Sequence, residues 1–233
     1  MVNNWLNIIQ HYLLPPTCIL CGNAGFDSND ICHGCFNDLN RNNHCCYRCA
    51  EIFETPNAAP QLCGHCVSQT PAFEETHAPF IHQGIIRHLI ARLKFNRQYQ
   101  NARLLGTLLA NHLEKTAEIP EIIIPVPLHK QRYRQRGFNQ SVEIAKTLSK
   151  QLNIPLDTKS CIRHRNTPHQ IDLPAKQRHK NIKNAFKNTK PIKASHVAIF
   201  DDVMTTGSTV NELAKLLKKA GVNRVDVWVC ARA

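Results

Sequence analysis

Four pairs of cysteines, each spaced two residues apart, constrain this chain more than any other feature of its sequence. Nine of its eleven cysteines fall within the first 66 residues, and eight of these form Cys18–Cys21, Cys32–Cys35, Cys46–Cys49 and Cys63–Cys66. A Cys-x2-Cys turn directs two thiolates to one point, and two such turns complete the tetrahedral shell of a zinc ion. The pattern predicts two structural zinc ions with these eight cysteines as ligands.

The order of the doublets favours two sites built from consecutive pairs, with ten residues between the pairs of the first site and thirteen between those of the second. A cross-braced arrangement stays open, and so does Cys45 as a ligand in place of Cys46. A [4Fe–4S] cluster is the rival of zinc, although regular doublets are more typical of zinc. A segment of about 65 residues with few apolar side chains needs such ions in place of a core.

After residue 70 the sequence changes to alternating apolar patterns, and Thr70-Pro71 and Ala78-Pro79 mark the change. We place one domain at 1–70 and another at 71–233. Helical spacing and short apolar runs predict helices over 85–93, 104–113, 138–152 and 208–220, and strands over 122–126, 197–200 and 225–229. Strands that alternate with helices predict an α/β fold with a mostly parallel sheet flanked by helices.

The stretch 197–209 carries the clearest chemistry. Asp201 and Asp202 follow an apolar run, and the loop Thr205-Thr206-Gly207-Ser208-Thr209 then opens a helix. Backbone amides at a helix start, with hydroxyl groups beside them, suit a phosphate, and carboxylates suit ribose hydroxyls or Mg²⁺. We therefore expect a ribose-phosphate site with two exposed carboxylates at an open strand end. A Walker A loop is excluded because no lysine follows the glycine.

The positive charge of the chain is concentrated in one segment. Residues 1–70 have a net charge of −3, whereas 129–193 hold sixteen Lys and Arg against three acids, a net of +13. This exceeds what one pyrophosphate needs, so we expect contact with the phosphodiester backbone of single-stranded DNA. The candidate contacts are Arg132, Arg134, Arg136, Arg163, Arg165, Lys176, Arg178, Lys180 and Lys183. Tyr133, Phe138 and Phe186 lie among them and either stack on bases or belong to the core.

Three stretches and the cysteine doublets carry a resemblance to known families. Residues 197–209 resemble the phosphoribosyl-pyrophosphate (PRPP) motif of type I phosphoribosyltransferases. Ile-Pro-Val-Pro-Leu-His at 124–129 and Arg-Gly-Phe-Asn-Gln at 136–140 are similar to the ComF family of competence proteins, whose double zinc ribbon the cysteine doublets also match. Further residues of this resemblance are Arg132, Arg134, Arg165, Thr167, Gln170, Leu173, Arg178, Asn181, Ala185 and Phe186.

The resemblance implies a type I phosphoribosyltransferase-like domain behind a small N-terminal double zinc ribbon. It implies that Asp201 and Asp202 face the ribose and that Thr205–Thr209 hold the 5′-phosphate. It also implies that Pro125–His129 form the pyrophosphate-side loop and that 163–187 form a mobile hood loop. The implied function is the handling of incoming single-stranded DNA during natural transformation, with PRPP or another ribose phosphate as ligand. DNA-uptake helicase or channel proteins are further expected partners.

An active, Mg²⁺-dependent phosphoribosyltransferase is the alternative function. No acceptor is identifiable in the sequence, and we assign no catalytic residue. Glutamine amidophosphoribosyltransferases use an N-terminal cysteine as nucleophile, and because the sequence begins Met1-Val2 we do not expect amidotransferase chemistry. The sequence also has no basic stretch at its start and no run of 18 apolar residues, so we expect a cytoplasmic protein without membrane insertion.

Overall fold

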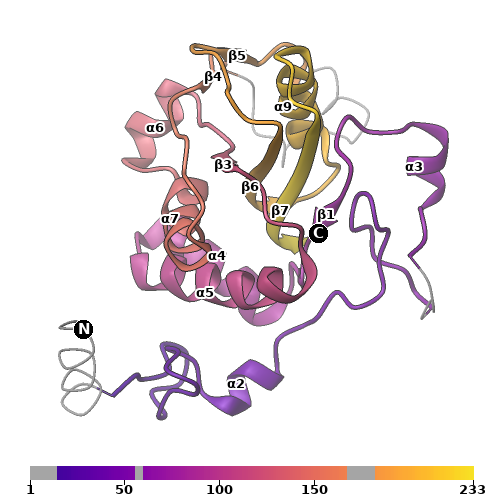
Figure 1. Cartoon of the computed structure of the whole chain (residues 1–233). Helices are drawn as coiled ribbons and strands as arrows, with labels where there is room; N and C mark the ends of the chain where they lie inside the picture. The colour runs from indigo at the N-terminus through magenta and orange to yellow at the C-terminus, as the bar shows by residue number, and fades with distance from the viewer. Residues whose placement is uncertain (1–14, 56–59, 167–181) are drawn as a thin grey trace.

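The computed structural model of the chain describes residues 15–55, 60–166 and 182–233. A parallel sheet forms its centre (Figure 1). The strands lie in the order β1 (Thr76–His77), β7 (Arg224–Arg232), β6 (His196–Met204) and β3 (Ile122–Pro125), and β2 (Phe80–Ile81) pairs with the far end of β7. Every pair in this sheet is parallel, which confirms the predicted architecture.

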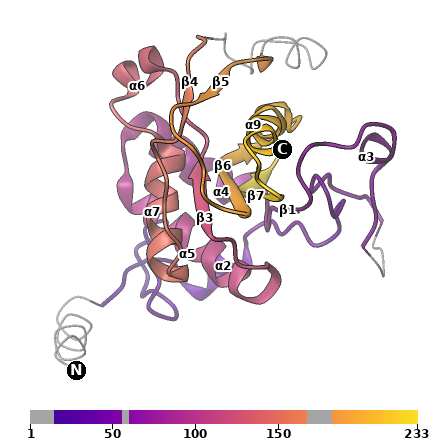
Figure 2. The same ribbon diagram turned by 45° about the horizontal axis from the view of Figure 1, so that its top comes forward.

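Helices cover both faces of the sheet (Figures 1 and 2). One face carries α4 (Gly84–Asn96), α5 (Tyr99–Thr116) and α7 (Gln140–Leu152), and the other carries α9 (Ser208–Lys219). Alternate residues of β6 divide between the two sides: Ala198 and Phe200 belong to the core cluster of α4, α5 and α7, whereas Val197 and Ile199 belong to that of α9. Because both faces are buried, β6 has an unbroken apolar run at residues 197–200, directly after His196.

The predicted helices are confirmed, with small shifts at their ends. The patterns over 85–93, 104–113 and 208–220 correspond to α4, α5 and α9. α7 begins at Gln140, two residues after the predicted start at 138, because Asn139 caps it. The Asn139 Oδ1 atom accepts a hydrogen bond from the Ser141 amide at 3.0 Å.

β6 is longer than the predicted strand 197–200. It continues through Asp201 and Asp202 to Met204, which lies opposite Arg232 of β7. The prediction that the strand ends before the two acids is therefore wrong. The physical reason is that β7 is equally long, so it offers ladder partners beyond the apolar run.

A smaller antiparallel pair lies apart from the main sheet. β4 (Cys161–Arg163) pairs with β5 (Phe186–Asn188), and α6 (Lys130–Arg136) precedes them in the chain. The pairing brings together the two ends of the segment expected to form a hood loop. Residues 167–181 of that segment lie outside the described residues, so its role stays a prediction.

The cysteine-rich part contains two short helices, each of which starts within the second doublet of a tetrad. They are α2 (His33–Asn37) and α3 (Gly64–Ser68), and both views place them far apart on the surface of the sheet and its helices (Figures 1 and 2). The domain boundary at residue 70 stays a prediction. Among the helices of the described residues, none has the length and apolar character needed to cross a membrane.

Candidate functional site

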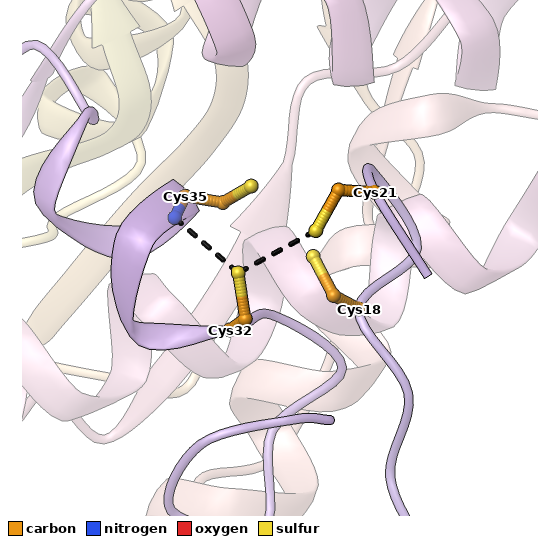
Figure 3. A group of neighbouring side chains, drawn as sticks. All are labelled: Cys18, Cys21, Cys32 and Cys35. Carbon is orange, nitrogen blue, oxygen red and sulfur yellow. Dashed lines mark hydrogen bonds between the residues drawn. The ribbon is translucent and has the colours of Figure 1, made fainter. Parts of the chain in front are cut away.

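The first four cysteines converge on one point (Figure 3). The Sγ atoms of Cys18, Cys21, Cys32 and Cys35 lie within 4.8 Å of one another. The Sγ atoms of Cys21 and Cys32 are 3.5 Å apart, and the Cys35 amide donates to the Cys32 Sγ atom at 3.4 Å. Four thiolates at these separations, with a backbone amide on one of them, fit a tetrahedral zinc ion.

The other four cysteines form a second tetrad of the same kind. Cys46, Cys49, Cys63 and Cys66 have their Sγ atoms within 4.8 Å of one another. The Cys63 amide donates to the Cys46 Sγ atom at 3.2 Å. Each tetrad combines consecutive doublets, so the cross-braced arrangement is excluded, and Cys45 belongs to neither group.

The first ribbon, residues 15–39, rests on α4 and α5 through apolar contacts. Ile31 is fully buried and belongs to the same core cluster as side chains of both helices. Two zinc ligands, Cys18 and Cys32, are part of that cluster as well. Arg103 of α5 adds an exposed ion pair with Asp30. The first tetrad is therefore continuous with the hydrophobic core.

The second ribbon, residues 42–55 and 60–69, is held to the end of the sheet by Arg232 of β7. This side chain is 8% exposed and forms an ion pair with Glu51. Its Nε atom donates to the Cys49 carbonyl oxygen at 3.2 Å, and its Nη1 atom donates to the Met204 carbonyl oxygen at 3.2 Å. One guanidinium thus joins the second ribbon to the last residue of β6.

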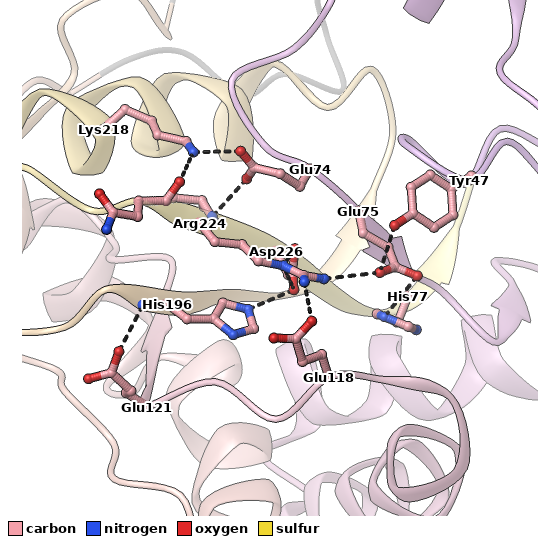
Figure 4. A network of polar contacts seen from close by, with 12 residues as sticks. Tyr47, Glu74, Glu75, His77, Glu118, Glu121, His196, Lys218, Arg224 and Asp226 are labelled. Atoms are coloured by element: carbon pink, nitrogen blue, oxygen red, sulfur yellow. Dashed lines mark hydrogen bonds and ion pairs between the residues drawn. The ribbon is translucent and has the colours of Figure 1, made fainter.

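A polar network joins the second ribbon to the opposite, amino end of β6 and β7 (Figure 4). Asp226, 1% exposed, lies 2.7 Å from the His196 Nε2 atom and accepts from the Arg224 Nε atom at 3.0 Å. The hydrogen bond with Asp226 raises the pKa of Arg224. Tyr47 of the second ribbon donates to Glu75 at 3.2 Å, and Arg224 pairs with the same carboxylate at 3.4 Å. All of these contacts are internal, so the network is structural.

The two predicted acids lie inside β6, near its carboxyl end. The Asp201 Oδ1 atom accepts from the Ser141 Oγ atom at 2.9 Å. Asp202 is 3% exposed, accepts from the Gln140 Nε2 atom at 3.2 Å and is ion-paired with Lys94. The expectation of two exposed carboxylates is therefore wrong, because the start of α7 and the last turn of α4 lie beside this part of β6 and supply partners for both acids.

The surroundings of the two acids shift their pKa values in opposite directions. Burial, together with the charge of Asp202, raises the pKa of Asp201 to about 7. Burial also acts against the charged form of Asp202, but the ammonium group of Lys94 outweighs it and lowers the pKa of that carboxyl. Asp202 is thus the more acidic member of the pair, and Asp201 is the member that holds a proton more readily.

The Thr205–Thr209 turn joins the end of β6 to α9. Gly207 has a φ of 72°, which favours glycine, and it directly precedes the first residue of the helix. The Thr206 Oγ1 and Ser208 Oγ atoms are 2.8 Å apart. The amides and the dipole at the start of this helix, beside these hydroxyl groups, have the chemistry of an anion site.

The basic residues of α6 approach the acids from another side. Arg134 is exposed, whereas Arg132 and Arg136 are half-buried. The Arg136 Nη1 atom donates to the Gln140 Oε1 atom at 2.5 Å, and Gln140 is the same side chain that contacts Asp202. α6 contains no acidic residue, so it is a basic helix next to the acidic pair.

Arg163 does not lie on an open surface, and its assignment as a DNA contact stays a prediction. It is 7% exposed, and burial with the nearby charge of Arg132 lowers its pKa to about 10. Its guanidinium carbon lies 5.8 Å from the centroid of the Phe186 ring. With Pro127 and His129, it lines a hollow of about 480 Å³ beside the predicted pyrophosphate-side loop.

The remaining candidate contacts divide between the described residues and those outside them. Arg165 and Lys183 are exposed, and Arg165 donates to the Lys183 carbonyl oxygen. Of the interspersed aromatic residues, Tyr133 is 52% exposed, but Phe138 and Phe186 are buried, so base stacking by these two is excluded. The candidates outside the described residues are Lys176, Arg178 and Lys180.

Sequence reasoning missed three side chains that complete this end of the sheet. Lys94 and Ser141 are partners of the two acids, and Arg232 fastens the second ribbon. Lys94 directly follows the apolar residues of a predicted helix, a position that many surface lysines occupy. Arg232 is one residue of a strand with alternating side chains, and neither position carries a signal of its contacts. Only Ser141 had a local signal, because it directly follows the Arg-Gly-Phe-Asn-Gln stretch.

Two family models match the chain in agreement with this geometry. Residues 9–75 match the double zinc ribbon domain, and residues 139–233 match the phosphoribosyl transferase domain. The first match spans both tetrads, and the second spans the acidic pair and the Thr205–Thr209 turn. The fold is thus that of a phosphoribosyltransferase-like domain behind a double zinc ribbon.

Individual proteins resemble the chain over most of its length. Competence protein F of Haemophilus influenzae is 37% identical over 93% of this chain and 96% of its own length. DNA utilization protein YhgH of Escherichia coli strain K12 is 37% identical over 73% of this chain and 77% of its own. A hypoxanthine phosphoribosyltransferase structure from Staphylococcus aureus aligns with 58% of this chain and 74% of its own, at 14% identity and a TM-score of 0.36. From the identity shared with competence protein F over nearly the full length of both chains, this protein belongs to the competence protein F family.

Proposed function

We propose that this protein acts in DNA uptake by binding incoming single-stranded DNA in the cytoplasm, and that its phosphoribosyltransferase-like domain keeps a ribose-phosphate site. The relatives support a role in DNA metabolism, because one is named for competence and the other for DNA utilization. DNA-uptake helicase or channel proteins are the partners that such a role would need.

The observation that carries the ribose-phosphate site is the grouping at the carboxyl end of β6. There the acidic pair Asp201 and Asp202 is followed by the Thr205–Thr209 turn at the start of α9. Ligands of open parallel sheets bind outside the carboxyl ends of the strands. The turn supplies amides and hydroxyls for a phosphate, and Asp201 supplies a carboxylate for ribose hydroxyls.

The DNA contact rests on charge. Arg132, Arg134 and Arg136 lie on one short helix without an acidic residue, and exposed Arg165 and Lys183 add to them. The segment 129–193 has a net charge of +13. A strand that follows this surface would release counterions from its phosphates, which makes the affinity fall as salt rises.

Neutralising the basic helix tests this contact. In Arg132→Gln/Arg134→Gln/Arg136→Gln, we expect weaker binding of a labelled oligodeoxynucleotide and a logarithmic salt slope that is smaller by about 2, at about 0.7 per lost phosphate contact. The matched control neutralises three exposed basic residues of other helices that lie outside the segment 129–193, namely Arg87, Lys115 and Lys219. Equal losses in both variants would contradict the assignment.

An active phosphoribosyltransferase is the second candidate, because the acids and the turn are both intact. Mg²⁺ would accompany PRPP in that case, although Asp202 already has Lys94 as its partner. Release of pyrophosphate from PRPP, measured with and without single-stranded DNA, separates the two functions. DNA binding without turnover supports the first, and turnover with a defined acceptor supports the second.

A further inference from the structure

A cavity of about 790 Å³ lies between the second ribbon and the carboxyl end of the sheet. Three ligands of the second tetrad, Cys49, Cys63 and Cys66, line one wall. Thr205, Thr206 and Gly207 of the turn that begins α9 line the same cavity. A zinc ribbon and the proposed phosphate turn therefore border one space, which is large enough for a ligand the size of a nucleotide.

This cavity adjoins a smaller hollow at the proposed ribose-phosphate site. The smaller hollow measures about 60 Å³ and is lined by Asp201 together with the turn. Met204, Thr205 and Gly207 line both spaces. A phosphorylated sugar bound at the turn would thus have the larger cavity directly beside it, and whatever is attached to the sugar has room to extend toward the second ribbon.

The charged groups of the cavity favour a neutral occupant. Arg232 is already engaged by Glu51, the Cys49 carbonyl oxygen and the Met204 carbonyl oxygen. Lys215 is exposed and belongs to a neighbouring hollow as well. The site therefore has no desolvated, unpaired cation among these lining residues that would call for a second phosphate.

The other lining groups suit a heterocyclic ring. Pro71, Phe73 and Met204 give apolar surface, and a thioether makes favourable contacts with flat rings. Gln69 and Thr70 are exposed at the edge of the cavity and provide both donors and acceptors of hydrogen bonds. Apolar walls with a few polar groups are the usual composition of a site for a small aromatic ligand.

We propose that this cavity binds the base of a nucleotide whose sugar phosphate lies on the Thr205–Thr209 turn, so that the second zinc ribbon forms the base-side wall of the site. The proposal rests on the proposed ribose-phosphate function. It gives the second ribbon a role in ligand recognition, whereas the first ribbon, which packs on α4 and α5, has none.

Calorimetric titrations with ribose 5-phosphate and with the four nucleoside 5′-monophosphates test this on the full chain. We expect at least one nucleoside monophosphate to bind about tenfold more tightly than ribose 5-phosphate. Thr70→Trp, which places a ring at the cavity edge, should remove that difference and leave the affinity for ribose 5-phosphate within twofold. Gln69→Trp is the second variant with the same expectation.

Val67→Trp is the matched control. Val67 lies on α3, just before Gln69 and Thr70, is 69% exposed and does not line the cavity. This variant should therefore bind all ligands as the unmodified protein does. A 5′-phosphorylated oligodeoxynucleotide that competes with the nucleoside monophosphate would show that the pocket takes the terminal base of a DNA strand. If the oligodeoxynucleotide does not compete, the pocket takes the base of a free nucleotide. Both results support a base pocket.

The outcomes distinguish the two levels of the proposal. If ribose 5-phosphate binds but no nucleoside monophosphate binds more tightly, or if Thr70→Trp and Gln69→Trp leave the difference unchanged, the base pocket is wrong and the ribose-phosphate site stands. If neither ribose 5-phosphate nor any nucleoside monophosphate binds, the proposed ribose-phosphate site itself fails, and the base pocket fails with it.

Discussion

The two ribbons have the same four-cysteine ligand set but are attached to the rest of the protein in different ways. In the first, the buried ligands Cys18 and Cys32 share a core cluster with α4 and α5. The second also joins a core cluster, that of β6, β7 and α9, through fully buried Ala50 and through Cys49, which packs against it. It has in addition the polar contacts of Arg232, and it lines a cavity beside the Thr205–Thr209 turn. Both zinc sites are thus tied to the core, and only the second borders the cavity for which we propose a ligand.

Removing a zinc ligand should have the largest effect and should separate the ribbons. Structural zinc contributes about 10–16 kcal/mol of apparent binding energy, so Cys18→Ser and Cys63→Ser should each lower the zinc content from about two ions to about one. Because Cys18 belongs to the main core, Cys18→Ser should destabilise the whole protein, whereas Cys63→Ser should disorder mainly residues 46–69.

Elemental analysis and hydrogen exchange measure these effects, and Cys45→Ser, outside both tetrads, is the control. One zinc ion or none in the unmodified protein would contradict the two-site assignment. If Cys63→Ser unfolded the whole protein and Cys18→Ser had only a local effect, the difference described between the two ribbons would be wrong.

Two arginines test the attachments themselves. Arg232→Gln removes a nearly buried side chain that holds Glu51 and two carbonyl oxygens, and we expect a loss of about 2–3 kcal/mol in the free energy of unfolding. Arg103→Gln breaks only the exposed pair with Asp30 and should cost less than about 1 kcal/mol. Urea denaturation compares the two, and a larger effect of Arg103→Gln would contradict the attachment described for each ribbon.

Asp201, near the carboxyl end of β6, should dominate the pH dependence of stability at that end of the sheet. Its pKa is raised from 3.8 to about 7, so between these values the folded state binds more protons than the unfolded one, and stability falls as the pH rises. Asp201→Asn should therefore stabilise the protein above pH 7, by about 1–3 kcal/mol, with little effect near pH 4. Asp202→Asn, which loses the charge paired with Lys94, should destabilise it at neutral pH.

The contacts at the amino end of the sheet should matter less. Tyr47→Phe removes the hydrogen bond from the second ribbon to Glu75, and because Tyr47 is 42% exposed, water replaces that partner. We expect a loss of about 0.5–1 kcal/mol in the free energy of unfolding. A loss as large as that of Arg232→Gln would place the main attachment of the second ribbon at the amino end instead.

Cadmium nuclear magnetic resonance tests the proposed role of the second ribbon in ligand binding. This experiment should change the stability of the protein little. Cadmium replaces zinc at thiolate sites, so the substituted protein should give two ¹¹³Cd resonances, which the one-site variants assign. A nucleoside 5′-monophosphate that binds in the cavity should shift the resonance of the second tetrad only. A shift of the first resonance alone would contradict the difference between the ribbons.

The local patterns of the sequence predicted most of the fold. Both tetrads use consecutive doublets, and helical spacing located α4, α5 and α9, because ligand spacing and apolar periodicity are properties of short segments. The turn at Gly207 was predicted for the same reason. Each of these features depends on neighbours within about a dozen residues.

The site was predicted less completely because its remaining parts are tertiary. The burial of Asp202 follows from Lys94 and Gln140, which reach it from two separate helices, and the extension of β6 follows from the length of β7. Nothing near residue 232 in the sequence indicates that its side chain holds a ribbon some 180 positions earlier. Such contacts arise from packing and leave no periodic signal.

The most direct test of the ribose-phosphate site is a PRPP titration of Asp201→Asn/Asp202→Asn, with Asp201→Asn alone as the variant that keeps the Lys94 pair. Loss of charge-assisted hydrogen bonds should cost about 1.5–3 kcal/mol for each carboxylate that contacts the ligand, a tenfold or greater loss of affinity. Single-stranded DNA should bind unchanged or more tightly, because two negative charges are gone. An unaltered PRPP titration in a double variant that remains folded would contradict a ribose-phosphate site at the end of β6.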